Sequence, residues 1–412
     1  MYAVIMAGGK GTRVASVNRD LPKPMLPING KPVLEYEIEC LRRQGITDII
    51  LSIGHLGEQI QAYFGDGSPF GVQITYIREE VPLGTAGALY YLKGRVREDF
   101  FLINGDLIFD VDFHRLMAFQ KQHQAMAALL GHPNNHPYDS GIIVADADGR
   151  VTGWLTKEDK RGWYRNCVNA GIHVLSPQLL EEMDAPKKID LDREILRPML
   201  PSGRVYVYRT PEYVKDMGTQ ERISQVEHDL QTGLVERKNL GKRQKAVFLD
   251  RDGTINRYVG FLRRPEEFQL LDGAAEAIQR INRSGYLAIV VTNQPVIARG
   301  EVTWEGLEEI HRKMETLLGQ EGAYLDDIFV CPHHPDKGFL GEVPAYKMDC
   351  ECRKPKPGLL LQAAEKYNID LAESWMIGDQ PKDAQAGDAA GCRTMWLNER
   401  MDLLGAVKEI DF

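Results

Sequence analysis

The sequence predicts an α/β protein with two Rossmann-like domains, and three observations support this fold class. The chain has 412 residues, more than one ordinary domain contains. Short apolar runs alternate with stretches of helical spacing, a pattern typical of mostly parallel sheets covered by helices. Two apolar runs, at residues 2–6 and 246–249, end directly at loops rich in glycine or aspartate. In open α/β sheets, ligands bind at such carboxyl ends of strands.

The first half of the chain alternates strands and helices. Strands are indicated by apolar runs of four to six residues, and helices by apolar residues spaced among charges. The expected elements are a strand at 2–6, a helix at 32–43, a strand at 48–53, a helix at 56–64, a strand at 72–77, a helical segment at 86–92 and a strand at 100–103.

The second half repeats this alternation after a polar stretch. Residues 233–245 are basic and contain two glycines, which is typical of an exposed linker. We therefore expect domains at 1–235 and 245–412, joined by a linker at 236–244. The expected elements of the second domain are a strand at 246–249, a helix at 274–284, a strand at 287–291, a helix at 303–318, a strand at 327–330, a helix at 357–366 and a strand at 375–377.

Composition excludes several classes of protein. The net charge of −9 argues against a nucleic-acid binder that works by phosphate neutralisation. The sequence contains no run of about 18 apolar residues, so it predicts no membrane-spanning helix. The amino terminus does not resemble a signal peptide. Six cysteines in 412 residues are too few for a disulfide scaffold. We expect a cytoplasmic protein with no nucleic-acid or membrane partner.

The loop at residues 8–13, Gly-Gly-Lys-Gly-Thr-Arg, follows the first strand directly. Its glycines allow close approach of the backbone to a phosphate, and its arginine is suited to phosphate oxygens. Lys23 stands between two prolines, Asp106 follows an apolar run, and Asp216 lies far downstream in Asp-Met-Gly-Thr. Two such carboxylates can hold one Mg²⁺ between nucleotide phosphates and a second substrate.

Together with PLGTAGAL (82–89), NGD (104–106), NAG (169–171) and DMGT (216–219), these motifs resemble the sugar-1-phosphate nucleotidyltransferases, which have a mixed GT-A-like sheet. Within that family the chain is most similar to heptose 1-phosphate guanylyltransferases. The resemblance implies attack of a sugar phosphate on the α-phosphate of GTP, with release of pyrophosphate. Transferases of this type often associate, so a homo-oligomer is one expectation.

The same resemblance assigns roles to individual residues. It implies nucleotide contacts by Gly8, Gly9 and Gly11, phosphate neutralisation by Arg13 and Lys23, Mg²⁺ ligation by Asp106 and Asp216, base or sugar contacts by Gly84, Thr85 and Gly87, and sugar contacts by Asn169 and Gly171. Lys157 would contact the sugar phosphate. Here the sequence departs from the family, because the usual Glu-Lys-Pro is Thr156-Lys157-Glu158.

The second domain begins with Asp250-Arg251-Asp252-Gly253-Thr254 after an apolar strand. Phosphoryl transfer through a carboxylate needs a nucleophile and a second acid that protonates the leaving group. Thr292 and Asn293 follow the next strand, and Lys354 and Asp379 follow later ones. We therefore expect these side chains to converge at one edge of a sheet.

In this order the motifs resemble the haloacid dehalogenase-like phosphatases. The resemblance implies that Asp250 is the nucleophile, Asp252 the general acid and base, and that Thr292 and Lys354 stabilise the transferred phosphoryl group. Mg²⁺ would be held by Asp250, Asp379 and the Asp252 carbonyl, with Asp383 orienting the site. Asn293, Gln294 and Arg353 would contact substrate. Pro295-Val296 replaces the usual Ser-Gly of the family.

Cys331, His333, Cys350 and Cys352 form two short clusters that suit structural zinc, with reduced loop cysteines as the alternative. The run CPHH…CxCRKPKPG resembles heptose bisphosphate phosphatases and the related histidinol phosphatases. That match implies these four ligands, with His334 a less favoured substitute. Cys40, Cys167 and Cys392 are expected to be packing residues.

The two resemblances together imply a bifunctional enzyme of GDP-heptose synthesis for surface polysaccharide. It would remove the 7-phosphate of D-glycero-D-manno-heptose 1,7-bisphosphate and transfer GMP from GTP to heptose 1-phosphate. Because the guanylyl branch uses the α-anomer, we hypothesise that anomer. Three alternatives remain at this point: a histidinol-phosphate phosphatase, a transferase for another sugar such as mannose 1-phosphate, and one domain serving as a non-catalytic binding module.

Overall fold

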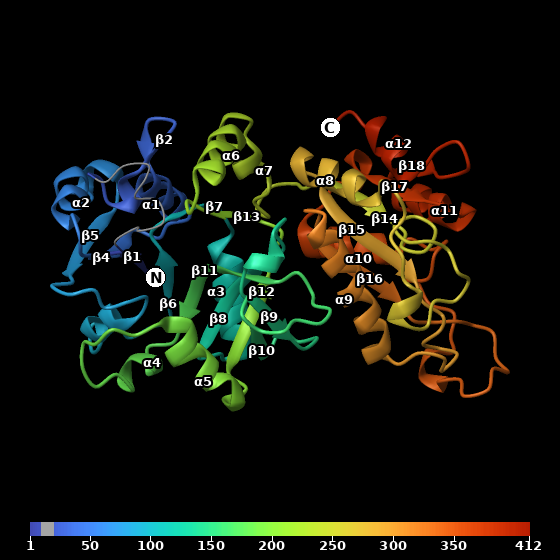
Figure 1. Ribbon diagram of the computed structural model, residues 1–412, viewed down its shortest axis with the longest axis horizontal. Coiled ribbons are helices and arrows are strands. Elements are labelled where there is room, and N and C mark those ends of the chain that lie inside the picture. Colours follow the sequence, from blue (N-terminus) through green and yellow to red (C-terminus); the bar gives the residue numbers. More distant parts are fainter. Residues whose placement is uncertain (10–19) are drawn as a thin grey trace. The chain divides into compact units, whose positions relative to one another are not determined.

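A computed structural model describes residues 1–9 and 20–412 of the chain. The chain divides into two compact units, drawn in Figure 1. Unit 1 comprises Met1–His132, Ile143–Trp154 and Asn169–Asn239, and unit 2 comprises Pro133–Ile142, Leu155–Val168 and Leu240–Phe412. Each unit is an α/β structure, so the predicted fold class is confirmed.

The main sheet of unit 1 is mixed and nine-stranded, with a parallel centre in the order β6-β1-β4-β5. Tyr2 of β1 pairs with Asp48 of β4, and Ala3 pairs with Phe101 of β6. β11 runs antiparallel to β6 and begins the antiparallel part of the sheet. The strands are β1 (Tyr2–Ala7), β4 (Asp48–Ile53), β5 (Gln73–Arg78), β6 (Phe100–Asn104), β8 (Ala127–His132), β9 (Ile142–Ala145), β10 (Val151–Leu155), β11 (Val168–Leu175) and β12 (Val205–Arg209).

A second, two-stranded sheet in unit 1 positions two of the predicted metal ligands. β7 (Leu107–Asp110) and β13 (Tyr213–Asp216) are antiparallel, with Asp216 opposite Leu107. Because Asp106 immediately precedes β7, residues 106 and 216 lie side by side although they are far apart in sequence. A short hairpin is formed by β2 (Pro27–Ile28) and β3 (Lys31–Pro32).

The helices of unit 1 bury their apolar faces against these sheets. Leu34, Ile38 and Leu41 of α1 lie at helical spacing and pack into the same core as Ile5 of β1. The helices are α1 (Val33–Arg43), α2 (Gly57–Phe64), α3 (Phe113–His123), α4 (Gln178–Glu181), α5 (Arg197–Met199), α6 (Gln220–Gln231) and α7 (Leu234–Arg237). The segment expected to be helical at 86–92 is a 3₁₀ helix, Gly87–Leu92.

Unit 2 contains a five-stranded parallel sheet in the order β16-β15-β14-β17-β18. Val247 and Leu249 of β14 pack into one core with α8, α9 and α12, and the alternate residues Ala246 and Phe248 pack into another with α10 and α11. The sheet is therefore covered on both faces. Its elements are β14 (Ala246–Leu249), β15 (Leu287–Asn293), β16 (Asp327–Cys331), β17 (Trp375–Gly378), β18 (Arg393–Trp396), α8 (Ala274–Ser284), α9 (Trp304–Gln320), α10 (Gly358–Tyr367), α11 (Pro381–Ala390) and α12 (Leu403–Lys408).

The stretch expected to be an exposed linker is partly folded and partly buried, so that expectation of exposure was wrong. Residues 234–237 form α7, whose Val235 packs in a core of unit 1. Leu240 is buried in a core of unit 2. The stretch is basic in composition, but single apolar residues within it pack into the core of unit 1 or the core of unit 2.

Unit 2 also includes two segments from the first half of the sequence, residues 133–142 and 155–168. The predicted division at 1–235, 236–244 and 245–412 has no such excursions, and its bounds remain a prediction. In the described part of the chain, no helix has the length and apolar character needed to cross a membrane.

His173 makes the stability of unit 1 dependent on pH. It lies in β11, is 2% exposed, and burial lowers the pKa of its imidazole to about 4. The unfolded chain, with an ordinary pKa near 6.5, therefore binds the proton more tightly than the folded one. We expect the free energy of unfolding to fall by about 2 kcal/mol from this residue between pH 7 and pH 5.

The measurement is urea unfolding of the wild type and of a His173→Leu variant at both pH values. The variant should lose less stability on acidification than the wild type. Equal losses in the two proteins would contradict this role of His173.

Candidate active sites

The first candidate site lies at the carboxyl ends of β14, β15 and β17 in unit 2, as expected for a parallel sheet. Asp250 directly follows β14 and is 6% exposed. Lys354 Nζ donates a hydrogen bond of 2.8 Å to Asp250 Oδ1. Burial raises the pKa of the Asp250 carboxyl, and the Lys354 charge offsets part of this rise. The structure thus places an aspartate beside a fully buried cation.

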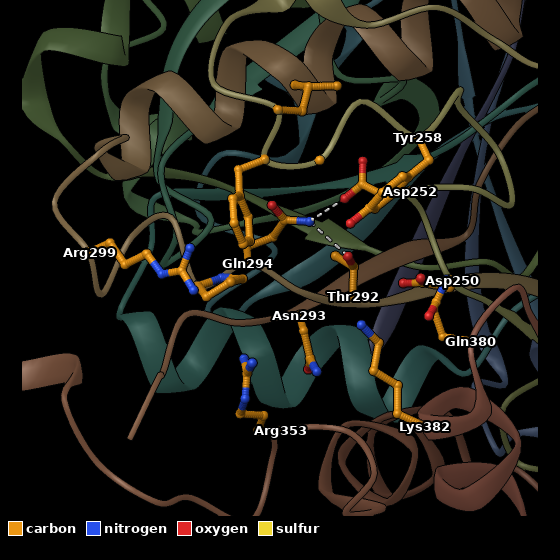
Figure 2. Close-up of a pocket in the computed structure, with 14 residues that line it drawn as sticks. Asp250, Asp252, Tyr258, Thr292, Asn293, Gln294, Arg299, Arg353, Gln380 and Lys382 are labelled. Carbon is orange, nitrogen blue, oxygen red and sulfur yellow. Dashed lines mark hydrogen bonds between the residues drawn. The ribbon is translucent and has the colours of Figure 1, made fainter. Parts of the chain in front are cut away.

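Asp252 is held by three neighbours, of which Figure 2 shows Gln294. Arg251 donates to both of its carboxylate oxygens, at 2.8 and 3.1 Å, Gln294 Nε2 donates to Oδ2 at 2.9 Å, and Asn256 Nδ2 donates to Oδ1 at 3.0 Å. Burial acts to raise the pKa of Asp252, but Arg251 and these hydrogen bonds bring it below its ordinary value. Asp252 is therefore a fixed carboxylate whose ionised form is stabilised by its neighbours.

Thr292 and Asn293 lie at the end of β15, beside both aspartates. Figure 2 shows Gln294 bridging Asp252 and Thr292 Oγ1, the latter at 2.9 Å. The Asn293 side chain holds the backbone of Lys354, because its Nδ2 donates to Lys354 O at 3.0 Å and its Oδ1 accepts from Lys354 N at 3.1 Å. The predicted phosphoryl-contacting residues of this unit therefore lie together.

Three carboxylates in this site meet the requirements of a divalent cation. One oxygen from each of Asp250, Asp379 and Asp383 lies within 4.8 Å of the others. Asp379 Oδ1 is buried and has no hydrogen-bond partner among the described residues. Such an orphaned carboxylate oxygen suits Mg²⁺, which binds oxygen ligands. Asp383 also pairs with Lys354 Nζ at 2.7 Å and accepts a hydrogen bond from Gln380 N at 3.0 Å, as an orienting residue would.

A pocket opens over these residues, and three cations line it: Arg299, Arg353 and Lys382. Arg299 lies over the ring of Phe261 at 4.1 Å, and Arg353 donates to the His333 carbonyl at 3.0 Å. The pocket is therefore suited to an anionic substrate larger than a single phosphate. Its remaining lining residues are Asp250, Asp252, Tyr258, Gly260, Phe261, Leu262, Thr292, Asn293, Gln294, Pro295 and Gln380.

Cys331, His333, Cys350 and Cys352 form one cluster at the end of β16. The sulfur–sulfur distances are 3.6 Å from Cys331 to Cys350 and 3.4 Å from Cys350 to Cys352, and His333 Nδ1 is 3.3 Å from Cys352 Sγ. Tetrahedral ligands with Zn–S bonds of about 2.3 Å lie roughly 3.8 Å apart. The four donors therefore fit zinc. His334 lies outside this cluster, and its Nε2 is 3.4 Å from Arg299.

The second candidate site lies in unit 1, at the ends of β1 and β6. Gly8 and Gly9 follow β1, whereas Gly11 and Arg13 lie outside the described residues. A Cβ at Gly8 would overlap the buried carboxylate of Glu79, so glycine is required there by close packing. Lys23 forms an ion pair with Asp106. The structure thus brings together the predicted phosphate-binding lysine and one predicted metal ligand.

Asp216 lies beside Asp106, since Met217 N donates to Asp106 O at 2.9 Å. Its carboxylate pairs with Arg222 at 2.6 Å. Glu37 of α1 is 1% exposed and accepts from Leu107 N at 3.0 Å. Burial and the charge of Asp106 raise the pKa of Glu37 well above its ordinary value. The carboxylates of Asp106 and Asp216 therefore lie at one sheet edge, each paired with a basic side chain.

The other predicted contacts of unit 1 surround residues 187–192. Cβ atoms at Gly84 and Gly87 would overlap the carbonyls of Ile189 and Lys187. Thr85 Oγ1 accepts from Leu191 N at 2.8 Å, and Asn169 Nδ2 lies 3.3 Å from both carboxylate oxygens of Asp192. Gly171 has φ of 76°, and a Cβ there would overlap Asn104. Close packing against residues 187–192 therefore accounts for Gly84 and Gly87, and close packing against Asn104 accounts for Gly171.

Lys157 is exposed and belongs to the excursion of residues 155–168, which is part of unit 2. The structure does not place it with the other predicted transferase residues. Sequence reasoning also missed several buried polar groups: Glu37, Glu79, Asn256 and His311. None of these residues belongs to a recognised sequence motif. The apolar residues next to each of them in sequence were the sole indication that its side chain is buried.

Comparisons with known proteins identify a different family for each part of the chain. Residues 2–233 match the nucleotidyl transferase family, and residues 124–391 match the haloacid dehalogenase-like hydrolase family. The chain belongs to both families and is an enzyme with nucleotidyltransferase and phosphatase activities.

Three known proteins illustrate this double likeness. The chain is 44% identical over 152 residues to D-glycero-beta-D-manno-heptose-1,7-bisphosphate 7-phosphatase from Yersinia pestis, covering 37% of this chain and 79% of that protein. It is 32% identical over 235 residues to mannose-1-phosphate guanylyltransferase from Mycobacterium tuberculosis, covering 56% of this chain and 65% of that protein. The crystal structure of HddC from Yersinia pseudotuberculosis superposes with a TM-score of 0.50 at 27% identity, covering 56% of this chain and 99% of HddC.

Gly253 tests the geometry of the phosphatase site. Its φ is 86°, and a Cβ would overlap the carboxylate of Asp379. We expect Gly253→Ala to lower kcat for phosphate release about 100-fold, because Asp379 must move away from Asp250. Gly391→Ala is the matched control, since Gly391 has φ of 83° but no atom near its would-be Cβ. Similar activity losses in both variants, measured as phosphate release, would contradict this explanation.

Proposed function

We propose that this chain is a bifunctional enzyme of GDP-heptose synthesis. The phosphatase removes the 7-phosphate of D-glycero-D-manno-heptose 1,7-bisphosphate, and the transferase moves GMP from GTP to the resulting heptose 1-phosphate. We propose that the GDP-heptose product is used to make surface polysaccharide. The proposal also requires a cytoplasmic enzyme, because GTP is made in the cytoplasm.

One observation carries the proposal. The same chain is 44% identical to a heptose bisphosphate phosphatase in one part and 32% identical to a sugar-1-phosphate guanylyltransferase in the other. The product of the first reaction, a sugar 1-phosphate, belongs to the substrate class of the second. Consecutive steps on one substrate explain why both catalytic units occur in one chain.

The phosphatase reaction follows from the arrangement around Asp250. A carboxylate oxygen of Asp250 attacks phosphorus, and the bond from phosphorus to the sugar oxygen breaks. Asp252 acts in this step in its protonated form and delivers its proton to that oxygen. Asp252 then takes a proton from water, which attacks the aspartyl phosphate and releases inorganic phosphate. Lys354 and Thr292 lie beside Asp250 and stabilise charge on the transferred group.

The transferase reaction needs no covalent intermediate. The sugar phosphate oxygen attacks the α-phosphorus of GTP, and pyrophosphate departs in line. Lys23 and Arg13 neutralise the nucleotide phosphates in this proposal, while Gly8, Gly9 and Gly11 admit them. Asn169, Gly171 and Lys157 are proposed to contact the sugar phosphate, and Gly84, Thr85 and Gly87 the base or sugar.

Two metals complete the proposal. Mg²⁺ would be held by Asp106 and Asp216 in unit 1, and by Asp250, Asp379 and the Asp252 carbonyl in unit 2. When bound, it would neutralise negative charge between carboxylates and phosphates. The zinc site formed by Cys331, His333, Cys350 and Cys352 would fix the loop that carries Arg353 and Lys354.

The anomer and the sugar deserve direct comparison. The phosphatase relative is named for the β-anomer, whereas our α-anomer hypothesis rests on the pairing with a guanylyltransferase. A histidinol-phosphate phosphatase, or a transferase for another sugar, is not favoured by the combined likeness. Mannose 1-phosphate is nevertheless the right competitor, because the relative that is 32% identical over 235 residues is a mannose-1-phosphate guanylyltransferase.

The decisive experiment is coupled turnover of each heptose 1,7-bisphosphate anomer with GTP and Mg²⁺. We expect inorganic phosphate, pyrophosphate and GDP-heptose from the α-anomer. Asp250→Asn should abolish phosphate release but leave pyrophosphate release from supplied heptose 1-phosphate unchanged. Asp106→Asn should do the reverse, so each variant controls for the other.

Three results would contradict the proposed substrates. These are preference for the β-anomer with ATP, faster turnover of mannose 1-phosphate than of heptose 1-phosphate, and faster phosphate release from histidinol phosphate than from either bisphosphate. Loss of both activities in both variants would contradict two independent sites.

Zinc content tests the structural metal. We expect about one zinc per chain in protein purified without chelators, measured by elemental analysis, because four donors converge at tetrahedral spacing. Cys352→Ser should lose the zinc and lower the Tm of the phosphatase unit. Cys392→Ser, a buried cysteine outside the cluster, should keep it. Zinc retained in Cys352→Ser would contradict this ligand set.

A further inference from the structure

A buried polar network within unit 2 connects residues 164–166 with the side chain of Asp252. Its centre is one face of α9, on which Glu308, His311 and Glu315 follow one another at spacings of three and four residues. His311 and Glu315 are 3% and 1% exposed. Polar groups this deeply buried need fixed partners, and the network supplies them.

Residues 164–166 hold the carboxyl-terminal half of α9. Arg165 pairs with Glu308 and Glu315, each at 3.0 Å. The backbone N–H of residue 166 donates to Glu315 Oε2 at 2.6 Å, and that of residue 164 donates to Thr316 Oγ1 at 2.9 Å. Three consecutive residues therefore bind Glu315 and Thr316 in one turn of the helix, and Arg165 also binds Glu308 about two turns earlier.

His311 connects this helix to the catalytic loop. Its Nε2 lies 3.2 Å from the guanidinium of Arg251. Burial, together with the charges of Arg251 and Arg165, lowers the pKa of His311 well below its ordinary value. Because arginine only donates hydrogen bonds, the neutral ring accepts this one.

Arg251 completes the path to the reacting group. It is fully buried, and its guanidinium contacts both carboxylate oxygens of Asp252 on one side and His311 on the other. The position of His311 on α9 therefore sets the position of the Arg251 guanidinium. That guanidinium in turn orients the carboxylate proposed to protonate the leaving group.

We propose that Arg165 is a positioning residue of the phosphatase reaction, acting through α9, His311 and Arg251 on the orientation of Asp252. The inference rests on the phosphatase half of the proposed function. In sequence, Arg165 lies between β10 and β11, far from the phosphatase motifs. The phosphatase site is thus completed by a segment whose next residues, from Asn169 onward, belong to unit 1.

The physical reason lies in the buried charge of Glu315. Arg165 is its cation, and a second oxygen of Glu315 has no hydrogen-bond partner among the described residues. A buried carboxylate that loses its partner must gain a proton or move toward water. Either response shifts the turn of α9 that carries His311.

The test compares two kinds of substrate. In Arg165→Ala we expect kcat for heptose bisphosphate to fall about tenfold with KM nearly unchanged. Single-turnover release of p-nitrophenolate from p-nitrophenyl phosphate should stay at the wild-type rate, because that leaving group departs without protonation. A general loss of structure would lower both rates together. Arg165→Lys, which keeps one charge, should recover part of kcat.

Two further variants make the test specific. Arg312→Ala removes a partly exposed arginine of α9 that pairs with Glu308 and Glu309, and it should leave both rates unchanged. In a Glu315→Gln background, the effect of Arg165→Ala should shrink to about threefold or less, since both residues act in one path. Should Arg165→Ala fail to fold, Arg165→Lys and Glu315→Gln carry the same comparison of substrates.

The inference is overturned if folded Arg165 variants keep wild-type kcat on the bisphosphate, or if they lose both rates in equal proportion. It is also overturned if Arg165→Ala and Glu315→Gln act independently. Failure of the proposed function has a different signature, because the wild-type enzyme itself would then release no phosphate from either heptose bisphosphate.

Discussion

The burial of Lys354 between two aspartates is the interaction on which the phosphatase unit depends. Its ammonium is fully buried and pairs with Asp250 at 2.8 Å and Asp383 at 2.7 Å. A buried cation is tolerated only with such partners, and each partner left alone would be a buried unpaired charge. The Asn293 side chain fixes the Lys354 backbone, and Asp383 lies in the first turn of α11. The interactions of Lys354 therefore connect the ends of β14, β15 and β17 with the loop that follows the cysteine cluster.

Both units place their functional side chains at the edge where parallel strands end, although the two sites carry out different chemistry. Parallel strands end at a common edge, so loops that are distant in sequence deliver side chains to one place. In unit 2 these are acidic and basic groups that handle a phosphoryl group. In unit 1 the same edge carries glycines after β1, the Lys23–Asp106 pair, and Asp216 brought alongside by β13. The difference in activity arises from the loops, because the sheets themselves are filled with apolar residues.

Much of the fold was predictable because strands and helices here have strong, regular hydrophobic patterns. The strand at 246–249 and the helix at 274–284 begin and end where they were predicted. The clustering of the phosphatase residues was also predictable, since Asp250 and Asp379 directly follow strands and Thr292 lies at the end of β15. The basic stretch after residue 233 was misjudged, because two buried apolar residues, Val235 and Leu240, outweigh its composition. Lys157 was expected with the transferase residues, but its segment packs as part of unit 2.

The sequence by itself determined the class of each catalytic unit. The nucleophile and the acid of one unit, and the glycine-rich loop of the other, each follow a strand at a short, recognisable distance in sequence. It also determined which cysteines and histidine were candidates for zinc. Only the tertiary structure decided which side chains support them. Glu37 lies under Asp106, and His311 lies against Arg251, although neither pair is close in sequence. Such partners are selected by burial, which requires every enclosed polar group to be satisfied and carries no signature in a linear motif.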